Sequence, residues 1–523
     1  MSNTTTNFIG ALNQTIANQS RILTENGAVS LATTGKSLLD FNYAVPSMRN
    51  IGEDDIMAKF GLVYAEDPDL AIKYMFMVRD VRGGMGERRL FRVLLKFFAA
   101  NHPCDLRRYL PIVPEYGRWD DLMSLVDTDL QDDVIKIVKE QLGKDFDNLQ
   151  AGKSISLLAK WLPSINTSSQ ATVLLAKKIA RELNMTDRQY RKMLSMMRGK
   201  IKIVEGQMSA SEWGEIEYSA VPSKANLIYS KAFLRHDEER RKAFIEDLKK
   251  GKTTINSSTC YPHDIVHRYA TEGGYRVNND VLEEMWKALP YRENISKPVI
   301  VVSDGSGSMT TKVSSSSSVS AMEVAQALSV FFSECLTGPY KDKFITFSMN
   351  PRYVDLSNCS SLHEKLFIAS RCCEVANTNI EKVFKMILDT AVNNSVPQEE
   401  IPDILIISDM EFDECVVEGK TKSTGAYDWG SALEPTSFEK FAEQYRDKGY
   451  DLPKVIFWNV ASRTNAIPMS QNKFGCALVS GFSQSNIDMV MSEKLDPYEI
   501  LVDKLNTQRY DLDKMLSEVL NRK

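Results

Sequence analysis

The stretch that decides the fold runs from Val299 to Ser308 and reads Val-Ile-Val-Val-Ser-Asp-Gly-Ser-Gly-Ser. Its first four residues form a β-branched apolar run, which is typical of a strand buried on both faces. Its last five residues form the pattern Asp-x-Ser-x-Ser, in which glycines permit a tight turn that aims alternate side chains inward. The sequence therefore predicts a buried strand that ends in a cluster of oxygen ligands.

Outward from this stretch, short apolar runs alternate with helical patterns. Similar runs occur at 344–347, 404–407 and 455–458, and the helical patterns between them cover 320–336, 379–392 and 435–448. Strands that alternate with helices predict a doubly wound, mainly parallel sheet. We expect this α/β domain to span residues 293–495.

Ligands of such a sheet collect just beyond the carboxyl ends of the strands. Five oxygen-bearing residues fall at that edge by sequence position: Asp304, Ser306, Ser308, Thr378 and Asp409. Two carboxylates and three hydroxyls form a hard-oxygen set with little negative charge, which suits octahedral Mg²⁺ or Mn²⁺. The alternative is that Asp304 and the serines only cap a loop.

This pattern resembles the metal-ion-dependent adhesion site of von Willebrand factor A domains. The resemblance implies that Ser306, Ser308 and Thr378 are metal ligands, and that Asp304 and Asp409 coordinate directly or through water. It also implies one open coordination position for an acidic residue of a protein partner.

The chain before the α/β domain has a different, helical pattern. Apolar residues recur at helical spacing from about 54 to 290, with turn residues between short segments. Helix pairs with short connections predict an all-α module of HEAT-like repeats over 46–292, although no clean fixed period is present. We expect 1–45 to be a polar segment that frays or lies over another part, and 496–523 to be helical and to return to the helical half.

The helical module resembles the TROVE module of the Ro autoantigen family, in particular a divergent branch from phages, bacteria and plants. The matching segments are 79–89, 114–122, 159–164, 208–213, 221–223 and 262–266. The resemblance implies a ring of helices that admits single-stranded RNA ends and carries structured RNA on a basic outer face.

Charge is divided unevenly along the chain. Residues 1–300 hold 42 Lys and Arg against 38 Asp and Glu, and 151–250 alone hold 19 against 11, whereas the remainder holds 22 against 31. Arg and Lys at this density suit phosphate oxygens, although a solvated helix face is the alternative. The candidate RNA-binding residues are Arg188, Arg191, Lys192, Arg198, Lys200, Lys202, Arg82 and Arg88.

Two of these candidates flank a glycine-rich turn at 83–86. The turn matches neither a dinucleotide fingerprint nor a P-loop, so a nucleotide site is not expected. The alternative to phosphate binding is a turn that joins two helices, with its arginines paired to Asp80 and Glu87.

These features favour a non-enzymatic RNA-binding scaffold with a metal-dependent docking site. The alternative is a protein-only adaptor that grips a partner's carboxylate through the metal and binds no RNA. A serine hydrolase is not favoured, because there is no G-x-S-x-G elbow and His363 is the only histidine after residue 300.

Composition limits the setting of the protein. No apolar run approaches the length of a membrane span, the first residues lack a secretory pattern, and no feature indicates DNA specificity. Eight cysteines without C-x-x-C predict free thiols, neither a disulfide framework nor a zinc site, and therefore a reducing, cytoplasmic location.

Overall fold

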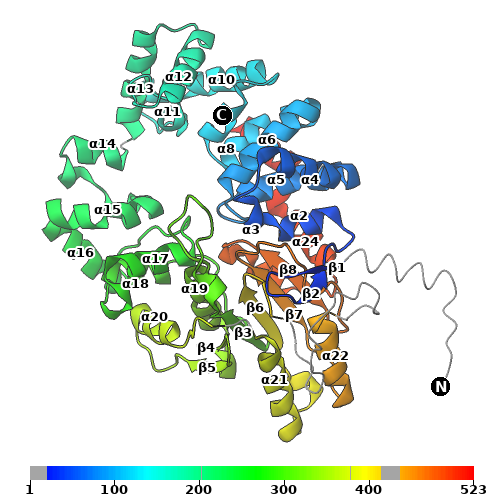
Figure 1. Cartoon of the computed structure of the whole chain (residues 1–523). Helices are drawn as coiled ribbons and strands as arrows, with labels where there is room; N and C mark the ends of the chain where they lie inside the picture. Colours follow the sequence, from blue (N-terminus) through cyan, green and yellow to red (C-terminus); the bar gives the residue numbers. More distant parts are fainter. Residues whose placement is uncertain (1–20, 202, 377–378, 414–435, 523) are drawn as a thin grey trace. The chain divides into compact units, whose positions relative to one another are not determined.

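The computed structural model describes residues 21–201, 203–376, 379–413 and 436–522, and these fold as two units (Figure 1). The α/β unit comprises the described residues within 1–52, 261–279 and 289–504. The helical unit comprises those within 53–260, 280–288 and 505–523. The predicted fold class, a helical region followed by an α/β domain with a mainly parallel sheet, is confirmed.

A six-stranded sheet in the order β5-β4-β3-β6-β7-β8 forms the centre of the α/β unit. All neighbouring pairs are parallel except β4 and β5, so an antiparallel strand lies at one edge. The four predicted apolar runs are β3, β4, β6 and β7, whereas β5 and β8 were not predicted. The strand bounds are Val299–Asp304 (β3), Lys343–Phe347 (β4), Arg352–Asp355 (β5), Asp403–Ser408 (β6), Val455–Asn459 (β7) and Cys476–Ser480 (β8).

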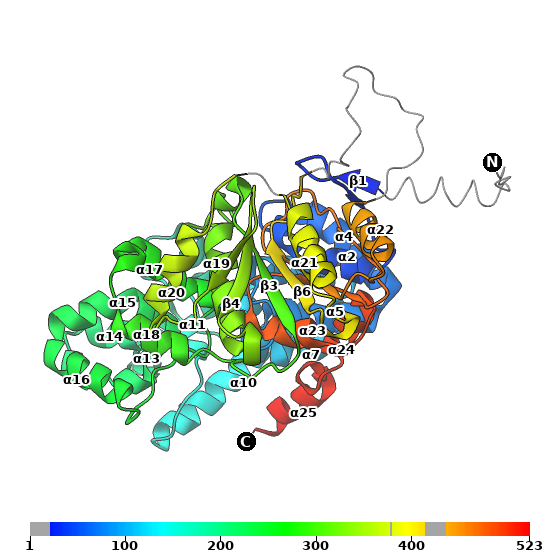
Figure 2. The ribbon, with the colours of Figure 1, turned by 90° about the horizontal axis from the view of Figure 1, so that it is seen from below.

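Helices cover both faces of this sheet. The ring of Phe457 in β7 packs edge-on against Phe438 of α22 at 4.8 Å, and the next residue, Trp458, packs against Phe332 of α19 at 5.2 Å. Because successive strand residues point to opposite faces, α19 and α22 lie on opposite faces. Figure 2 shows α17, α19 and α20 grouped together. The helix bounds are Ala321–Cys335 (α19), Leu362–Arg371 (α20), Glu381–Asn393 (α21), Ser437–Asp447 (α22), Ile487–Met491 (α23) and Pro497–Leu505 (α24).

Two distant segments complete the α/β unit. The described N-terminal residues form a hairpin of β1 (Arg21–Leu23) and β2 (Val29–Leu31), then α2 (Ser37–Tyr43) and α3 (Val45–Met48). Leu31 exchanges two backbone hydrogen bonds with Ile467, of 2.8 and 2.9 Å. Helix α17 (Pro262–Glu272) packs against α19 in this unit, although it lies inside the range 46–292 of the predicted helical module.

The helical unit consists of helices that pack mainly on their sequence neighbours, such as α4 on α5, α5 on α6, α12 on α13, and α15 on α16. The longer helices are Glu53–Glu66 (α4), Pro68–Arg79 (α5), Arg88–Asn101 (α6), Gln131–Gln150 (α10), Gln170–Glu182 (α12), Asp187–Ile201 (α13), Ser223–His236 (α15), Glu238–Lys249 (α16) and Leu512–Asn521 (α25). The shorter ones are Pro103–Tyr109 (α7), Val113–Tyr116 (α8), Trp119–Leu122 (α9), Leu158–Trp161 (α11), Val204–Ser209 (α14) and Asp280–Lys287 (α18).

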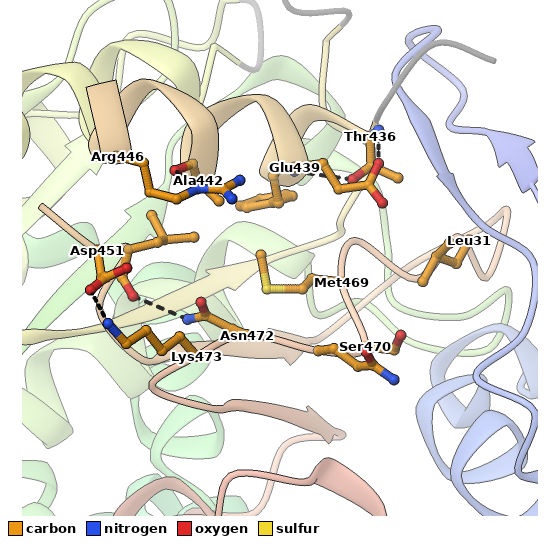
Figure 3. A pocket seen from close by; sticks show the side chains of 13 residues that line it. Leu31, Thr436, Glu439, Ala442, Arg446, Asp451, Met469, Ser470, Asn472 and Lys473 are labelled. Atoms are coloured by element: carbon orange, nitrogen blue, oxygen red, sulfur yellow. Dashed lines mark hydrogen bonds and ion pairs between the residues drawn. The ribbon is translucent and has the colours of Figure 1, made fainter. Parts of the chain in front are cut away.

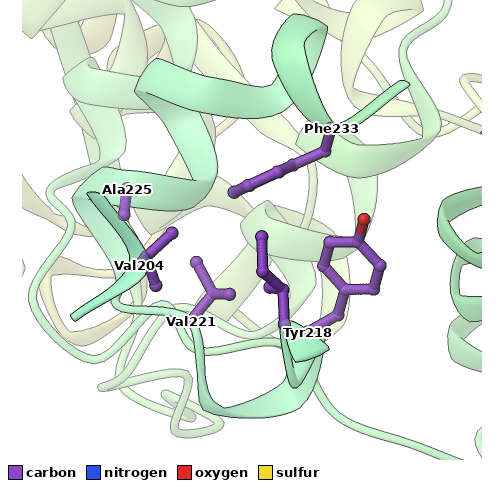
Figure 4. Packing of buried hydrophobic residues seen from close by; sticks show 6 residues of the cluster. Val204, Tyr218, Val221, Ala225 and Phe233 are labelled. Carbon is purple, nitrogen blue, oxygen red and sulfur yellow. The ribbon is translucent and has the colours of Figure 1, made fainter. Parts of the chain in front are cut away.

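One core of this unit surrounds a buried arginine. Figure 4 shows Val204, Tyr218 and Phe233 gathered with Val221 and Ala225. The guanidinium of the fully buried Arg241 lies 4.8 Å from the Tyr218 ring and 5.2 Å from the Phe233 ring. Burial lowers its pKa to about 10, and the faces of these rings supply electrostatic attraction in place of a carboxylate.

A second core contains the charged residue Asp121. Its carboxylate is fully buried and accepts hydrogen bonds from Arg79 Nε at 2.7 Å, Arg92 Nε at 2.8 Å and the Arg118 amide at 3.1 Å. Burial alone would raise the pKa of Asp121, but the charges and hydrogen bonds of Arg79 and Arg92 outweigh it and lower that pKa. Asp121 therefore joins α5, α6 and α9.

The glycine-rich turn at 83–86 is filled by residues of the same unit. Asp80 accepts hydrogen bonds from the Gly83 amide at 3.1 Å and from Arg509 Nη2 at 2.7 Å. A β-carbon on Gly84 would lie 2.0 Å from the Met77 carbonyl oxygen. The turn joins α5 to α6, in line with the helix-joining part of the second interpretation, and it also packs against the segment 505–523, which neither interpretation included.

Two observations bear on the setting of the protein. Among the described residues, no helix is both long and apolar enough to cross a membrane. The seven cysteines within the described ranges are all free, as the sequence predicts.

We predict that Asp121→Ala lowers the free energy of unfolding by about 3–5 kcal/mol, because it leaves the buried Arg79 without a counter-charge. Asp129→Ala, at an exposed aspartate nearby, is the matched control and should shift stability by under about 0.5 kcal/mol. Urea denaturation of both variants tests this. Equal stability of the two would show that Asp121 does not join these helices energetically.

Candidate metal centre

The predicted metal site begins where β3 ends. Asp304 is the last residue of β3, and its Oδ1 accepts a hydrogen bond of 2.9 Å from the Ser306 amide. The hydroxyls of Ser306 and Ser308 lie 3.1 Å apart. Gly305 leaves room for a close neighbour, because a β-carbon there would lie 3.3 Å from the Cys373 α-carbon. The loop thus brings one carboxylate and two hydroxyls to the same edge of the sheet.

The neighbouring parallel strand β6 supplies the second carboxylate. Ser408 ends β6, and its hydroxyl donates a hydrogen bond of 2.6 Å to Asp304 Oδ2. The next residue, Asp409, accepts a hydrogen bond of 3.2 Å from the Glu411 amide to Oδ1. The Ser308 hydroxyl lies near enough to Asp409 to oppose the rise of its pKa. Four of the five predicted ligands are therefore brought together. Thr378, the fifth, lies outside the described residues.

The two aspartates have an unusual electrostatic environment. Both are fully buried. Burial and the charge of Asp409 raise the pKa of Asp304 to about 7. Burial also raises the pKa of Asp409, although the Ser308 hydroxyl and the charge of Arg463 oppose this rise. A pair of buried carboxylates is costly unless a cation compensates it.

The residues present fit a divalent cation. Asp409 Oδ2 is buried and accepts no hydrogen bond from the described part of the chain. Around it stand the second carboxylate and two hydroxyl oxygens, which are the hard ligands that Mg²⁺ and Mn²⁺ prefer. Among the described residues there is no cluster of three or more His, Cys, Asp or Glu side chains that could hold a metal. Hydroxyls would therefore have to complete the ligand set.

Sequence reasoning missed three further residues at this edge. Glu411 is fully buried and accepts hydrogen bonds from the amides of Glu25, Arg463 and Thr464 at 2.9, 2.8 and 3.0 Å. Glu411 could have been suspected, because it stands two residues after Asp409. No motif in the sequence around Glu25 or Arg463 indicates a site, because only the folding of the chain brings these two residues to the edge of the sheet.

The candidate RNA-binding residues divide into two groups. Arg188, Arg191 and Lys192 are exposed on α13. By contrast, Arg198 donates hydrogen bonds to the carbonyls of Ala159 and Leu162, of 2.8 and 2.7 Å. These bonds tie α13 to α11 and to the residue that follows it.

The other candidates have local partners or cannot be placed. Arg88 forms an ion pair with Asp120 at 2.5 Å. The sequence had suggested that the arginines of the turn pair with Asp80 and Glu87, but the partner of Arg88 is Asp120. Lys200 donates a hydrogen bond of 3.2 Å to the Gly152 carbonyl. Arg82 is exposed, and Lys202 lies outside the described residues.

The α/β unit also has a cavity of about 600 Å³ between α22 and the segment 469–473 (Figure 3). Phe438, Leu452 and Met469 contribute its buried apolar wall. Its charged rim is largely paired, since Lys473 forms an ion pair with Asp451. None of the sequence-predicted site residues lines this cavity.

Comparison with known proteins places the chain in a family. The family model described as "Domain of unknown function (DUF2828)" matches residues 24–142 and 128–294. A second model, "Domain of unknown function (DUF7788)", matches residues 298–516. The DUF2828 model covers more than half of the 523 residues, and the protein therefore belongs to the DUF2828 family.

The protein is also similar to "Uncharacterized protein L728" of Acanthamoeba polyphaga mimivirus. The two are 28% identical over 552 residues, which cover 95% of this chain and 91% of the viral protein. The similarity therefore includes both the helical region and the α/β domain. Neither family description names the Ro or the von Willebrand factor A family.

We predict that Mg²⁺ or Mn²⁺, at about 100 times its dissociation constant, raises the free energy of unfolding by about 2.7 kcal/mol. Asp304→Ala should abolish this increment, because it removes one of the two buried carboxylates. Asp389→Ala, at an exposed position of α21, is the control and should preserve it. Thermal unfolding with and without each metal measures the effect. A wild-type protein that responds to neither metal would contradict the site.

We also predict that metal affinity increases with pH up to about 7 and then levels off. The raised pKa means that the folded, metal-free protein keeps a proton on Asp304 that the unfolded chain loses above about pH 4. The free energy of unfolding of the metal-free protein should therefore fall as pH rises from about 4 to about 7. Mn²⁺ titrations at about pH 6 and about pH 8 test this, and stronger binding at the lower pH would contradict it.

Proposed function

We propose that the protein is a non-enzymatic RNA-binding scaffold with a divalent-cation-dependent docking site. In this proposal the α/β unit holds Mg²⁺ or Mn²⁺ and uses it to bind an acidic group of a protein partner. The helical unit binds RNA through phosphate contacts. The observation that carries the docking half is the pair of buried carboxylates Asp304 and Asp409. The Oδ2 atom of Asp409 accepts no hydrogen bond from the described residues, and the Arg463 guanidinium is its charged neighbour at 3.3 Å.

The fold supports the docking half in a second way. The Asp-x-Ser-x-Ser loop follows a central strand, at the carboxyl edge where open α/β sheets bind ligands. A mainly parallel sheet with one antiparallel edge strand and this loop resembles the von Willebrand factor A domain. On that resemblance, the cation would retain one position for a partner's carboxylate.

The serines of the site support a binding role over a hydrolytic one. The hydroxyls of Ser306 and Ser308 lie 3.1 Å apart, and Ser308 is near Asp409. A serine nucleophile requires a base such as histidine within hydrogen-bond reach. The described contacts of these serines include no histidine, which supports a role as metal ligands over a role as nucleophiles.

Helix α13 supports the RNA half. Arg188, Arg191 and Lys192 are three and four residues apart, so they share one exposed face. Within the part of the chain that the structure describes, Arg191 Nε donates only to the Asp187 carbonyl of its own helix, at 3.3 Å. The charged ends of this face are therefore available to phosphate oxygens, which every RNA offers whatever its sequence.

The alternative function, a protein-only adaptor, has one observation in its favour. Arg198, Arg88 and Lys200 each have partners within the helical unit, so the cationic set is smaller than the sequence indicates. A small exposed charge excess is also common on solvated surfaces. The adaptor function predicts metal-dependent capture of a protein and little RNA at physiological salt.

For the RNA function, we predict that log affinity falls linearly with log salt, by about 0.7 for each phosphate neutralised on single-stranded RNA. Changing Arg188, Arg191 and Lys192 together to Ala should make this slope shallower by up to about 2 and weaken binding to all sequences. Filter binding with several RNAs over a range of salt concentrations measures both effects.

The matched control for this triple change is Lys242, Lys250 and Lys252 to Ala. These lysines lie in the same unit, but each lies within ion-pair distance of a neighbouring acidic residue. The control should leave the salt slope nearly unchanged. If wild-type protein forms no saturable complex with any RNA at low salt, the RNA function is wrong and the adaptor function is left.

A further inference from the structure

Arg463 lies beside the candidate metal centre, in the segment that follows β7. Its Nη2 lies 3.3 Å from Asp409 Oδ2, the oxygen that accepts no hydrogen bond. Its Nε donates a hydrogen bond of 2.6 Å to Glu25 Oε2. The side chain is 35% exposed. One cation thus faces both a buried carboxylate of the centre and a carboxylate from the N-terminal hairpin.

The backbone around this arrangement is held in place by Glu411. The amides of Arg463 and Glu25 donate to the two oxygens of this buried carboxylate, at 2.8 and 2.9 Å. Thr24 adds a hydrogen bond of 2.7 Å from its hydroxyl to the Phe412 carbonyl. The positions of Arg463 and Glu25 are therefore fixed through their backbones. An exchange of partners between their side chains would require no movement of these backbones.

The positive charge of Arg463 is unfavourable for a cation bound at Asp409. A guanidinium near Asp409 opposes a divalent cation on the same carboxylate, because like charges repel strongly where water is excluded. Glu25 counters this effect, since its carboxylate pairs with Nε and Nη2 of the same guanidinium. A carboxylate bound at the open position of a metal held by Asp409 would lie within reach of the same guanidinium.

We propose that Arg463 is the second anion contact of the docking site, and that Glu25 occupies this arginine when no partner is bound. The partner's carboxylate would bind to the metal and to Arg463 together, and would displace Glu25. This inference rests on the metal-dependent docking function proposed above. It adds the residue that recognises the carboxylate and the internal group that competes with it.

The test measures the affinity for Mn²⁺ of the full-length protein by calorimetry, in chloride and in acetate. If acetate binds to the metal and to Arg463 together, it must strengthen Mn²⁺ binding by the same factor as Mn²⁺ strengthens acetate binding. Glu25→Gln should increase this factor severalfold, because the internal competitor is lost. Arg463→Gln should reduce the factor to about 1, and Arg463→Lys should restore part of it.

Mn²⁺ affinity in chloride provides a second readout. Arg463→Gln should strengthen it by about tenfold, because a cation is removed from Asp409. Glu25→Gln should weaken it, because the guanidinium then turns fully to Asp409. The control variants are Arg446→Gln and Glu443→Gln, at exposed positions of α22, which should change neither quantity.

The outcomes separate this inference from the proposed function. If wild-type protein binds no Mn²⁺, the docking function is wrong and the inference falls with it. If wild-type protein binds Mn²⁺, but the Glu25 and Arg463 variants shift its affinity in the same direction or leave the acetate effect unchanged, only the inference is overturned. Opposite shifts, with the acetate effect lost in Arg463→Gln alone, would support it.

Discussion

The burial of two carboxylates side by side is the constraint on which the α/β unit depends. Asp304 ends β3, Asp409 directly follows the adjacent parallel strand β6, and both are fully buried. The surrounding chain supplies donors in compensation, among them the Ser306 amide and the hydroxyl of Ser408. Yet one carboxylate oxygen accepts no hydrogen bond from the described residues, and the burial of both groups raises their pKa values. An arrangement with this electrostatic cost suggests a functional site.

The sequence was sufficient for the centre of this unit because its signals are local. Four runs rich in Val, Ile and Phe predicted the four central strands, and the polar residues that follow 299–303 and 404–407 predicted the edge of the sheet. The edge strand Arg352–Asp355 was not predicted because it is polar, exposed and short. Glu25 and Arg463 were not predicted either, because they are 438 residues apart and carry no pattern. Only the path of the chain brings them together.

The sequence is limited in the same way for the candidate RNA-binding surface, because the contacts there also depend on the path of the chain. A sequence counts cations but does not show which of them have partners. Arg198 ends the same helix that presents Arg188 and Lys192, yet it faces the carbonyls of 159–162, where its donors are used. Asp120 and Asp121 likewise engage Arg88 and Arg79, whereas the sequence neighbours Asp80 and Glu87 had suggested other pairs. Charge density therefore overestimates the free cationic surface.

The charge of the proposed centre explains why serines rather than a third carboxylate surround it. Two carboxylates and one divalent cation sum to zero, so the centre could still accept an anion at its open position. A third carboxylate among the ligands would make it negative and would repel an acidic partner. The nearest additional acid, Glu411, has its oxygens occupied by backbone amides and the hydroxyls of Ser462 and Thr464. In the proposed centre, Arg463 would then add a positive charge that biases the open side towards a carboxylate.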